Sequence, residues 1–404
     1  MARHGKYRKG FSERLGKVPA RLRLEGKQRP AIWLHAVSVG EVLAIAGVVE
    51  ELRTRLPEYR FVISTTTDTS QELARRRFGE ENVFYFPLDF AFAIRPYLQA
   101  LKPHLVVIAE TEFWPNFLRL TRACGSRLAL VNARISDRSW PGYRRFRTLL
   151  RKVLINVDLF LAQTFEDAVR LADIGAIADR VKVTGNLKFD LGAAPPSIPI
   201  VESLRQTLAR TGAGPVLVCG STVDGEEILL LQAFRDLLAV HPQTLMVLAP
   251  RHPERFSAVG ELVDQMEIPL IRRSLWNDEK IAGKVFLLDT IGELSAVYAL
   301  ADIAFVGGSL VRRGGHNIIE PAQYGVATVV GPYTENFRDI VNLFRSRDAV
   351  RVVNPKELSK VLVDLLGNEE ARKALGKRAA ETICSQAGAT TRTANELLRL
   401  LAQP

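Results

Sequence analysis

The chain has 404 residues, enough for two ordinary domains, and its 47% hydrophobic and 25% charged residues are typical of a folded globular protein. Cys124, Cys219 and Cys384 form no CxxC pair and the six histidines show no HxxxH spacing, which argues against a disulfide framework or a zinc site and fits a reducing cytoplasm. The net charge of +11 points to an anionic partner. The sequence has no uncharged apolar run near 18 residues and no signal-peptide pattern, so any contact with a membrane is expected to be peripheral.

Apolar runs that alternate with helical patterns predict repeated βα units along the whole chain. In the first half, strands are expected near 31–38, 60–66, 83–86, 104–109, 127–132, 157–162 and 181–184, with helices such as 41–55, 70–78 and 165–174. In the second half, strands are expected near 215–220, 244–249, 285–288, 302–306 and 327–330. The three prolines of residues 193–199 indicate a linker. The predicted fold is therefore α/β, with Rossmann-like parallel-sheet domains at 1–192 and 200–384 facing a cleft, and a helix at 385–404 that packs back on the first domain.

Polar residues follow several strands of the first half, at the sheet edge where open parallel sheets bind ligands. Glu41 starts a helix, where it is either an acid favoured by the helix dipole or a general base kept ionised by that dipole. Glu110 and Glu112 follow the strand at 104–109, and either acid could hold a substrate or steady an arginine. Lys188, just before the linker, could meet a phosphate.

In the second half, a glycine-rich turn at 307–315 follows a buried strand and precedes a short helix expected at 321–325. Such a turn predicts an anion site, because glycine lets the backbone approach a phosphate and the helix start offers free N–H groups. Asn317 could then bind a phosphate or a base, and Glu320 could bind ribose hydroxyls; the alternative is a tight turn with an incidental acid. Arg251 could contact a phosphate or cytosine, and the backbone at Ile291 and Gly292 could read a base edge.

Two basic clusters account for most of the net charge. Residues 1–30 hold ten Lys and Arg against two acids, and the second cluster is opposed only by Asp137 and comprises Arg134, Arg138, Arg144, Arg145, Arg147, Arg151 and Lys152. Each cluster could be an ordinary solvated surface, or could bind nucleic acid, an anionic membrane or an anionic substrate.

Seven stretches in order, at 35–41, 110–116, 132–139, 185–190, 250–256, 289–294 and 307–321, resemble the 3-deoxy-D-manno-oct-2-ulosonic acid (Kdo) transferases of lipopolysaccharide synthesis. The resemblance covers nearly the whole chain. It implies a GT-B fold and a glycosyltransferase that moves Kdo from CMP-Kdo to a lipid A precursor (lipid IVA), with inversion, without metal and without a cofactor. The first domain would bind the acceptor and the second the CMP-sugar.

By the same resemblance, Glu41 would accept the proton, and Glu110 and Lys188 would stabilise the transition state. The residues that would bind CMP are Pro250, Arg251, Ile291, Gly292, Glu293, Asn317, Ile318, Ile319 and Glu320. The chain departs from the usual Asn-Pro-Leu-Glu at Ile318 and Ile319, and from the usual methionine at Ile291, but it keeps the polar contacts.

The family usually has an apolar anchor before its Tyr-Arg segment, and this chain starts almost at Tyr7. We therefore expect either a shortened chain or a natural form held by charge at the cytoplasmic face of the bacterial inner membrane. Three alternatives stay open: another GT-B enzyme with a uridine donor, a catalytically inactive relative, and a nucleic-acid-binding protein. The basic clusters of this chain lack interleaved aromatic residues, and the sequence has no recognisable RNA- or DNA-binding motif, so no nucleic acid is expected as a partner.

Overall fold

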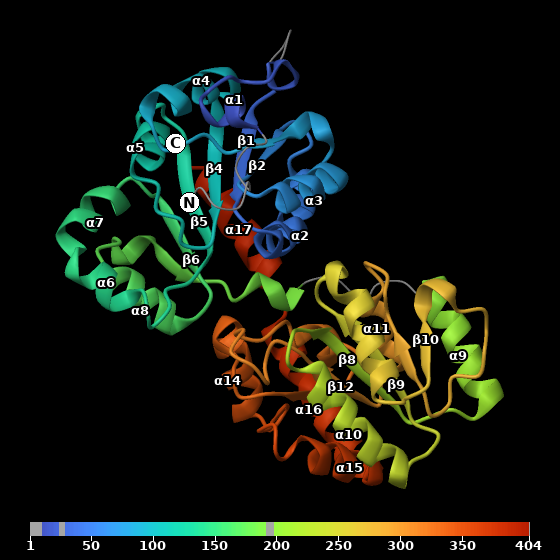
Figure 1. Ribbon diagram of the computed structural model, residues 1–404. Helices are drawn as coiled ribbons and strands as arrows, with labels where there is room; N and C mark the ends of the chain where they lie inside the picture. The colour runs from blue at the N-terminus through green and yellow to red at the C-terminus, as the bar shows by residue number, and fades with distance from the viewer. Residues whose placement is uncertain (1–9, 24–28, 191–197, 404) are drawn as a thin grey trace. The chain divides into compact units, whose positions relative to one another are not determined.

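The computed structural model describes residues 10–23, 29–190 and 198–403. The chain divides into two compact units, one formed by residues 1–191 with 386–404 and the other by residues 192–385. Each unit contains one seven-stranded sheet whose paired strands are all parallel (Figure 1). The predicted α/β class with two parallel sheets is confirmed. Of the predicted linker, residues 193–197 lie outside the described residues, and Pro199 already begins a helix.

The first unit alternates strands and helices as the apolar pattern predicts. Its strands are β1 (Ala31–Ala36), β2 (Arg60–Thr65), β3 (Val83–Tyr85), β4 (Pro103–Ala109), β5 (Arg127–Ala133), β6 (Leu159–Ala162) and β7 (Val181–Val183). Its helices are α1 (Phe11–Arg14), α2 (Val39–Arg55), α3 (Asp68–Phe78), α4 (Ala91–Leu101), α5 (Pro115–Ala123), α6 (Trp140–Arg145), α7 (Arg147–Leu154), α8 (Phe165–Asp173) and α17 (Ala389–Leu401), with a 3-10 turn, η4 (Leu187–Asp190).

The strand order of this unit is β3-β2-β1-β4-β5-β6-β7, so the order reverses between β1 and β4. Both faces of the sheet are buried, and alternate residues of one strand therefore belong to different cores. Ile32 and Leu34 belong to the core shared with α2, α3 and α17, whereas Trp33 belongs to the core shared with α4 and α5. In a doubly wound sheet the ligand crevice opens at such a reversal, beyond the carboxyl ends of the strands. The segments after β1 and β4 are those that carry Glu41 and Glu110.

The C-terminal helix α17 returns to the first unit, as predicted. Figure 1 shows it in red among the blue and teal elements of that unit. It packs on α2 and on η4, and its Ala394, Leu397 and Leu400 are buried in the same core as α2. The last helix therefore supports the elements that carry Glu41 and Lys188.

The second unit repeats the architecture. Its strands are β8 (Val216–Thr222), β9 (Leu245–Pro250), β10 (Leu270–Arg272), β11 (Val285–Leu287), β12 (Ile303–Val306), β13 (Ala327–Val330) and β14 (Arg351–Val352), in the order β10-β11-β9-β8-β12-β13-β14. Its helices are α9 (Pro199–Thr211), α10 (Glu227–Val240), α11 (Phe256–Gln265), α12 (Leu294–Val297), α13 (Ile319–Ala322), α14 (Arg338–Ser346), α15 (Leu358–Gly367) and α16 (Glu369–Gln386). Here the order reverses between β8 and β12.

The predicted strands lie within two residues of the observed ones, but β10 and β14 were not predicted. The helix expected at 321–325 is instead α13, which begins at Ile319. This correction places Glu320 inside the first helical turn rather than ahead of it.

Candidate functional site

Glu41 lies in the first turn of α2, and its side chain is buried. Its Oε2 accepts a hydrogen bond from the Val37 N–H at 2.7 Å, and its Oε1 accepts one from the Ser38 hydroxyl at 2.7 Å. Burial, with the negative charges of Glu110 and Glu112, raises the pKa of Glu41 to about 7. The expectation that the helix dipole keeps this acid ionised is therefore outweighed by burial. A carboxyl group with a pKa near 7 is suited to take up a proton at neutral pH.

Glu110 and Lys188 form an ion pair in the same unit, with 3.3 Å between the Nζ of Lys188 and the Oε1 of Glu110. Glu110 follows β4, and Lys188 lies in η4 after β7. Because the charge of Glu110 also raises the pKa of Glu41, the three predicted catalytic side chains lie within electrostatic reach of one another. The structure thus gathers a buried acid and an anion–cation pair at the carboxyl edge of one sheet.

Two residues of this edge have left-handed backbones that only glycine adopts at no cost. Glu110 has φ 58°, and Asn132, near the end of the neighbouring strand β5, has φ 54°. The Glu110 N–H donates to the Val131 carbonyl at 2.8 Å, so the two strained turns are linked. Strained non-glycine residues of this kind are concentrated at functional sites, where the surrounding structure holds them in place. The sequence did not single out Asn132 for a role.

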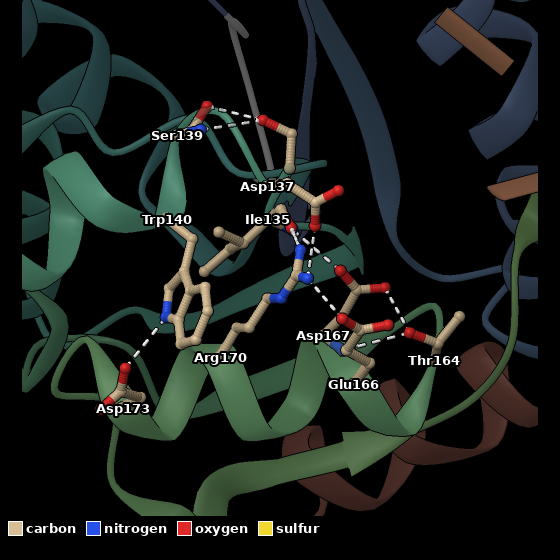
Figure 2. A network of polar contacts seen from close by, with 10 residues as sticks. Ile135, Asp137, Ser139, Trp140, Thr164, Glu166, Asp167, Arg170 and Asp173 are labelled. Atoms are coloured by element: carbon tan, nitrogen blue, oxygen red, sulfur yellow. Dashed lines mark hydrogen bonds and ion pairs between the residues drawn. The ribbon is translucent and has the colours of Figure 1, made fainter. Parts of the chain in front are cut away.

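Arg170 of α8 holds the segment that follows β5 (Figure 2). Its guanidinium donates to the Ile135 carbonyl at 2.6 Å and pairs with Asp137, and it lies over the Trp140 ring. Asp167 of the same helix accepts a hydrogen bond from the Ile135 N–H at 2.9 Å. This network fixes the loop at 134–139, which begins the second basic cluster.

The second basic cluster covers α6 and α7. Arg147, Arg151 and Lys152 of α7 are exposed. The apolar side chains of Phe146, just before this helix, and of Leu149 within it are also exposed, at 60% and 64%. Cations interleaved with exposed apolar side chains on a short helix are typical of a surface that meets a lipid interface. Of the first basic cluster, residues 1–9 and 24–28 lie outside the described residues.

The glycine-rich turn of the second unit corrects a prediction. The carboxylate of Glu226, which is fully buried, accepts hydrogen bonds from the N–H groups of Gly308, Ser309 and Leu310 at 2.7 to 2.8 Å. It also accepts one from Val223 at 3.1 Å. Burial raises the pKa of Glu226 and the four donors oppose that shift, because they stabilise the ionised form. The protein's own carboxylate therefore occupies the anion position where the turn was expected to bind phosphate.

Arg251, His316 and Glu320 lie within electrostatic reach of one another in the second unit. Burial raises the pKa of Glu320, and Asn317 and Arg251 partly oppose the shift. Burial and the charge of Arg251 lower the pKa of His316 to about 4, so its imidazole is neutral at pH 7. The Asn317 Nδ2 donates to Glu320 at 3.3 Å and its Oδ1 accepts from the Ile319 N–H at 3.2 Å. A cation, an amide and an acid thus converge after β9 and at the start of α13.

Other predicted nucleotide-binding residues differ in what they can offer. Ile318 and Ile319 are buried, and so is Pro250 at the end of β9, so none of these three residues presents an exposed side chain to a ligand. Ile291 is 80% exposed and precedes Gly292 with φ 90°, so this turn presents both a backbone and an apolar side chain.

Glu293, by contrast, is already paired. Its carboxylate receives two hydrogen bonds from Arg273, at 3.1 and 3.0 Å, and a third from Thr290. A carboxylate with this many partners serves to fix the turn that carries Ile291 and Gly292.

Across residues 10–23, 29–190 and 198–403, no three His, Cys, Asp or Glu side chains gather in a way that could hold a metal ion. Within the same part of the chain, no helix combines the length and the apolar character that crossing a bilayer requires.

Comparisons with known proteins identify relatives over most of the chain. The family model described as 3-Deoxy-D-manno-octulosonic-acid transferase (kdotransferase) matches residues 9–191. The 3-deoxy-D-manno-octulosonic acid transferase of Haemophilus influenzae is 34% identical over 89% of this chain and 85% of that protein. The enzyme of the same name from Bordetella pertussis is 34% identical over 94% of this chain and 91% of its own length.

Solved structures share the fold at lower identity. The UDP-GlcNAc 2-epimerase of Neisseria meningitidis is 14% identical, covers 91% of this chain and all of its own, and has a TM-score of 0.61. The glycotransferase of kitacinnamycin is 16% identical, covers 92% of this chain and 99% of its own, and has a TM-score of 0.54. These likenesses agree with the expected GT-B architecture and carry no information on the substrate.

Proposed function

Because the chain belongs to the 3-deoxy-D-manno-octulosonic acid transferase family, we propose that it transfers Kdo from CMP-Kdo to a lipid A precursor by a direct, inverting displacement without metal. Enzymes of this family are glycosyltransferases. The donor, the lipid IVA acceptor and the roles of individual residues are the parts that we propose.

In the proposed step, a hydroxyl oxygen of the acceptor forms a bond to the anomeric carbon of Kdo. The bond from that carbon to the phosphate oxygen of CMP breaks, and CMP leaves with the bonding electrons. The hydroxyl proton passes to the carboxylate of Glu41. A positioned base of this kind contributes roughly 10²- to 10⁴-fold to the rate.

The observation that carries the proposal is the state of Glu41. Its carboxyl group is buried, is held by Val37 and Ser38, and has a pKa raised to about 7. A buried acid whose pKa is raised at the carboxyl edge of a parallel sheet is a candidate base on physical grounds. The structural alternative is a helix-capping acid, but a cap gains nothing from having two further acids close by.

Charge that develops on the departing phosphate requires cations, because the proposed step uses no metal. Lys188 offers one in the first unit, where Glu110 orients its ammonium group. Arg251 offers another in the second unit, with Asn317 and Glu320 placed to bind the nucleotide. The exposed turn at Ile291 and Gly292 is suited to contact the base through its backbone.

The acceptor carries phosphates and acyl chains, so we propose that the enzyme works at an anionic membrane surface, on the cytoplasmic face of the inner membrane. The cations and exposed apolar side chains of α6 and α7 support peripheral binding there. Each Lys or Arg near such a surface contributes about 1 kcal/mol.

The test is mass spectrometry of a tetraacylated lipid A precursor incubated with the protein and freshly generated CMP-Kdo in the presence of EDTA, with Glu41→Ala in parallel. A mass gain of one or more Kdo units with the wild type alone supports the donor, the acceptor, the base and the lack of a metal requirement. A mass gain with Glu41→Ala equal to that of the wild type would remove Glu41 as the base.

Nucleotide binding separates this proposal from a uridine donor. Tight binding of CMP with weak binding of UDP fits the proposal, whereas the reverse preference would favour another enzyme of the same fold. A wild type that binds CMP but transfers nothing would point to a different acceptor.

A further inference from the structure

The turn η4, which carries Lys188, is tied at its C-terminal end to the start of α17. Asp190 accepts hydrogen bonds from the N–H groups of Gly388 at 2.8 Å and Thr390 at 2.5 Å. The first N–H groups of a helix lack partners within the helix, and Gly388 has no side chain to cap them. Asp190 therefore acts as the N-terminal cap of a helix about 200 residues further along the chain, where a negative charge is also favoured by the helix dipole.

The same turn is tied at its N-terminal end to β5. The side-chain oxygen of Asn132, a residue with only 1% exposure, accepts the Leu187 N–H at 3.0 Å. The approach to the turn is held as well, because the Arg392 side chain donates to the Thr184 carbonyl at 2.8 Å. The residues on either side of Lys188 are thus fixed by β5 and by α17, while Lys188 itself reaches Glu110.

We infer that Asn132 and Asp190 are positioning residues that hold Lys188 against Glu110, and that α17 is a working part of the site although it contributes no side chain to the reaction. The inference rests on the role proposed for Lys188 and deepens it. It also gives a reason for the strained backbone of Asn132, which lies within β5 where the pairing with β6 shifts register and where its amide oxygen meets Leu187.

The contact between Asp190 and the start of α17 lies close to both points where the chain passes from one unit to the other. The chain leaves the first unit after residue 191 and re-enters it at residue 386, so both crossings lie within a few residues of the contact between Asp190 and Gly388. Lys188 is two residues from Asp190, so the contact fixes the chain close to the point where it leaves the first unit. A misplacement of about 1 Å is sufficient to lower a rate by about 10²-fold.

The clamp can be tested without substrate, by hydrogen–deuterium exchange of the peptide that spans residues 184–190. We expect Asp190→Asn, and Asn132→Gly, to speed exchange at Leu187 and Lys188 by tenfold or more. Glycine tolerates the left-handed backbone, so this second change removes the amide with little added strain. The matched control is Asn395→Ala, which removes a 2.7 Å hydrogen bond from Arg55 to the same helix and leaves η4 untouched.

The consequence for catalysis is tested by a double-mutant cycle with Lys188→Ala. Asp190→Asn should lower kcat by roughly ten- to a hundredfold, leave CMP affinity within twofold, and have less than a twofold effect when Lys188 is already alanine. If Asp190 had only a general structural role, Asp190→Asn would instead lower kcat by the same factor in the wild type and in Lys188→Ala.

Unchanged exchange at residues 184–190, or losses that multiply in the cycle, would overturn the inference. The failure of the proposed function has a different signature, since the wild type would then show no Kdo transfer at all. In that case the exchange measurement still decides whether Asn132 and Asp190 hold the lysine.

Discussion

The ammonium group of Lys188 lies 3.3 Å from the carboxylate of Glu110, although 78 residues separate the two along the chain. Both side chains are partly exposed, at 23% and 31%, so solvent screens the pair and its contribution to stability is small. The pair nevertheless forms on a strained backbone at Glu110. Because the strained backbone of Glu110 is not offset by a stabilising ion pair, we infer that this arrangement serves the chemistry of the site.

We therefore predict that Lys188→Ala lowers kcat by about 10²- to 10³-fold and changes the melting temperature by less than roughly 2 °C. The reason is that the ammonium group is proposed to offset charge on the departing phosphate. Turnover of CMP-Kdo and thermal unfolding of the same preparation measure the two effects.

The matched control is Lys182→Ala, which removes another lysine–glutamate pair of the same unit, at 2.5 Å from Glu396. Its kcat should stay within twofold of the wild type. If both variants lose activity to the same extent, the loss reflects general damage to the first unit.

The pKa of Glu41, raised to about 7, predicts the pH dependence of the reaction. A base works only when ionised, so kcat/KM should fall tenfold per pH unit below about 7 and level off above it. The profile is measured with the wild type between pH 5.5 and 9. A midpoint near 4.5, the ordinary value for this acid, would contradict the assignment.

Glu110→Gln provides an internal check on that profile. The negative charge of Glu110 is one cause of the raised pKa of Glu41, so its removal should shift the midpoint to lower pH as well as reduce the rate. Glu254→Gln, an exposed acid of the second unit, should leave the midpoint unchanged. A midpoint that does not move in Glu110→Gln would show that the titrating group is not Glu41.

The raised pKa of Glu41 should also make the stability of the protein depend on pH, but in the opposite direction to the activity: stability should fall as the pH rises. The folded protein binds the proton of Glu41 up to about pH 7, whereas the unfolded chain loses it near 4.5. Glu41 therefore lowers the free energy of unfolding as the pH rises through this window. Glu41→Gln should weaken that decline while abolishing transfer, and chemical denaturation at pH 5 and pH 8 measures it.

The carboxylate of Glu226 should be essential to the second unit. Glu226→Gln leaves a single acceptor oxygen for four backbone donors, so we expect the unfolding free energy to fall by about 2 to 4 kcal/mol. In calorimetry this corresponds to a melting temperature lower by roughly 5 to 15 °C. CMP binding should weaken as well, because Asn317 and Glu320 follow the turn that this carboxylate fixes.

Asp224→Asn is the control for this variant, since Asp224 lies two residues away and is 81% exposed. It should unfold within about 2 °C of the wild type. Equal stability of Glu226→Gln and the wild type would mean that the turn does not depend on the buried charge.

The sequence predicted most of the sheet because a buried parallel strand is an uninterrupted apolar run, as in Ile303–Val306. It missed β10 and β14, the two edge strands of the second sheet, which have three residues and two residues and each include an arginine that interrupts the apolar pattern. Strands of that length are defined by the neighbours with which they pair.

Some residues of the candidate sites could likewise be predicted from the sequence and others could not. Glu41, Glu110 and Lys188 could be proposed because each follows a predicted strand, and residues that follow parallel strands gather at one edge of the sheet. The function of Glu226 could not, since its partners are 82 to 84 residues away and the glycine-rich turn looks the same whether a ligand or a side chain occupies it. The tie between Asp190 and α17 spans a still longer separation.

The basic cluster on α6 and α7 predicts binding to anionic vesicles. The charge reversals Arg151→Glu and Lys152→Glu together should weaken binding to vesicles with anionic lipid by tenfold or more, and added salt should weaken the wild type. Sedimentation with vesicles of neutral lipid provides the baseline. Kdo transfer to a detergent-solubilised acceptor should change little, so a loss there would place these residues in acceptor binding instead.

Arg251 is the residue on which CMP affinity should depend most directly. It is exposed beyond β9, yet its charge helps to lower the pKa of His316 and partly opposes the rise that burial causes in the pKa of Glu320. It therefore lies close to both residues, where the proposed nucleotide phosphate would meet the start of α13. Arg251→Ala should weaken CMP binding by about 10- to 100-fold, which corresponds to the loss of a charged hydrogen bond, and Arg251→Lys should retain only part of the wild-type affinity.

Calorimetric titration measures the affinity of each variant for CMP. The control is Lys373→Ala, which removes an exposed cation on α16. Unchanged affinity in Arg251→Ala would remove this residue from the nucleotide site, and an equal loss in Lys373→Ala would mean that overall charge, not position, attracts the nucleotide.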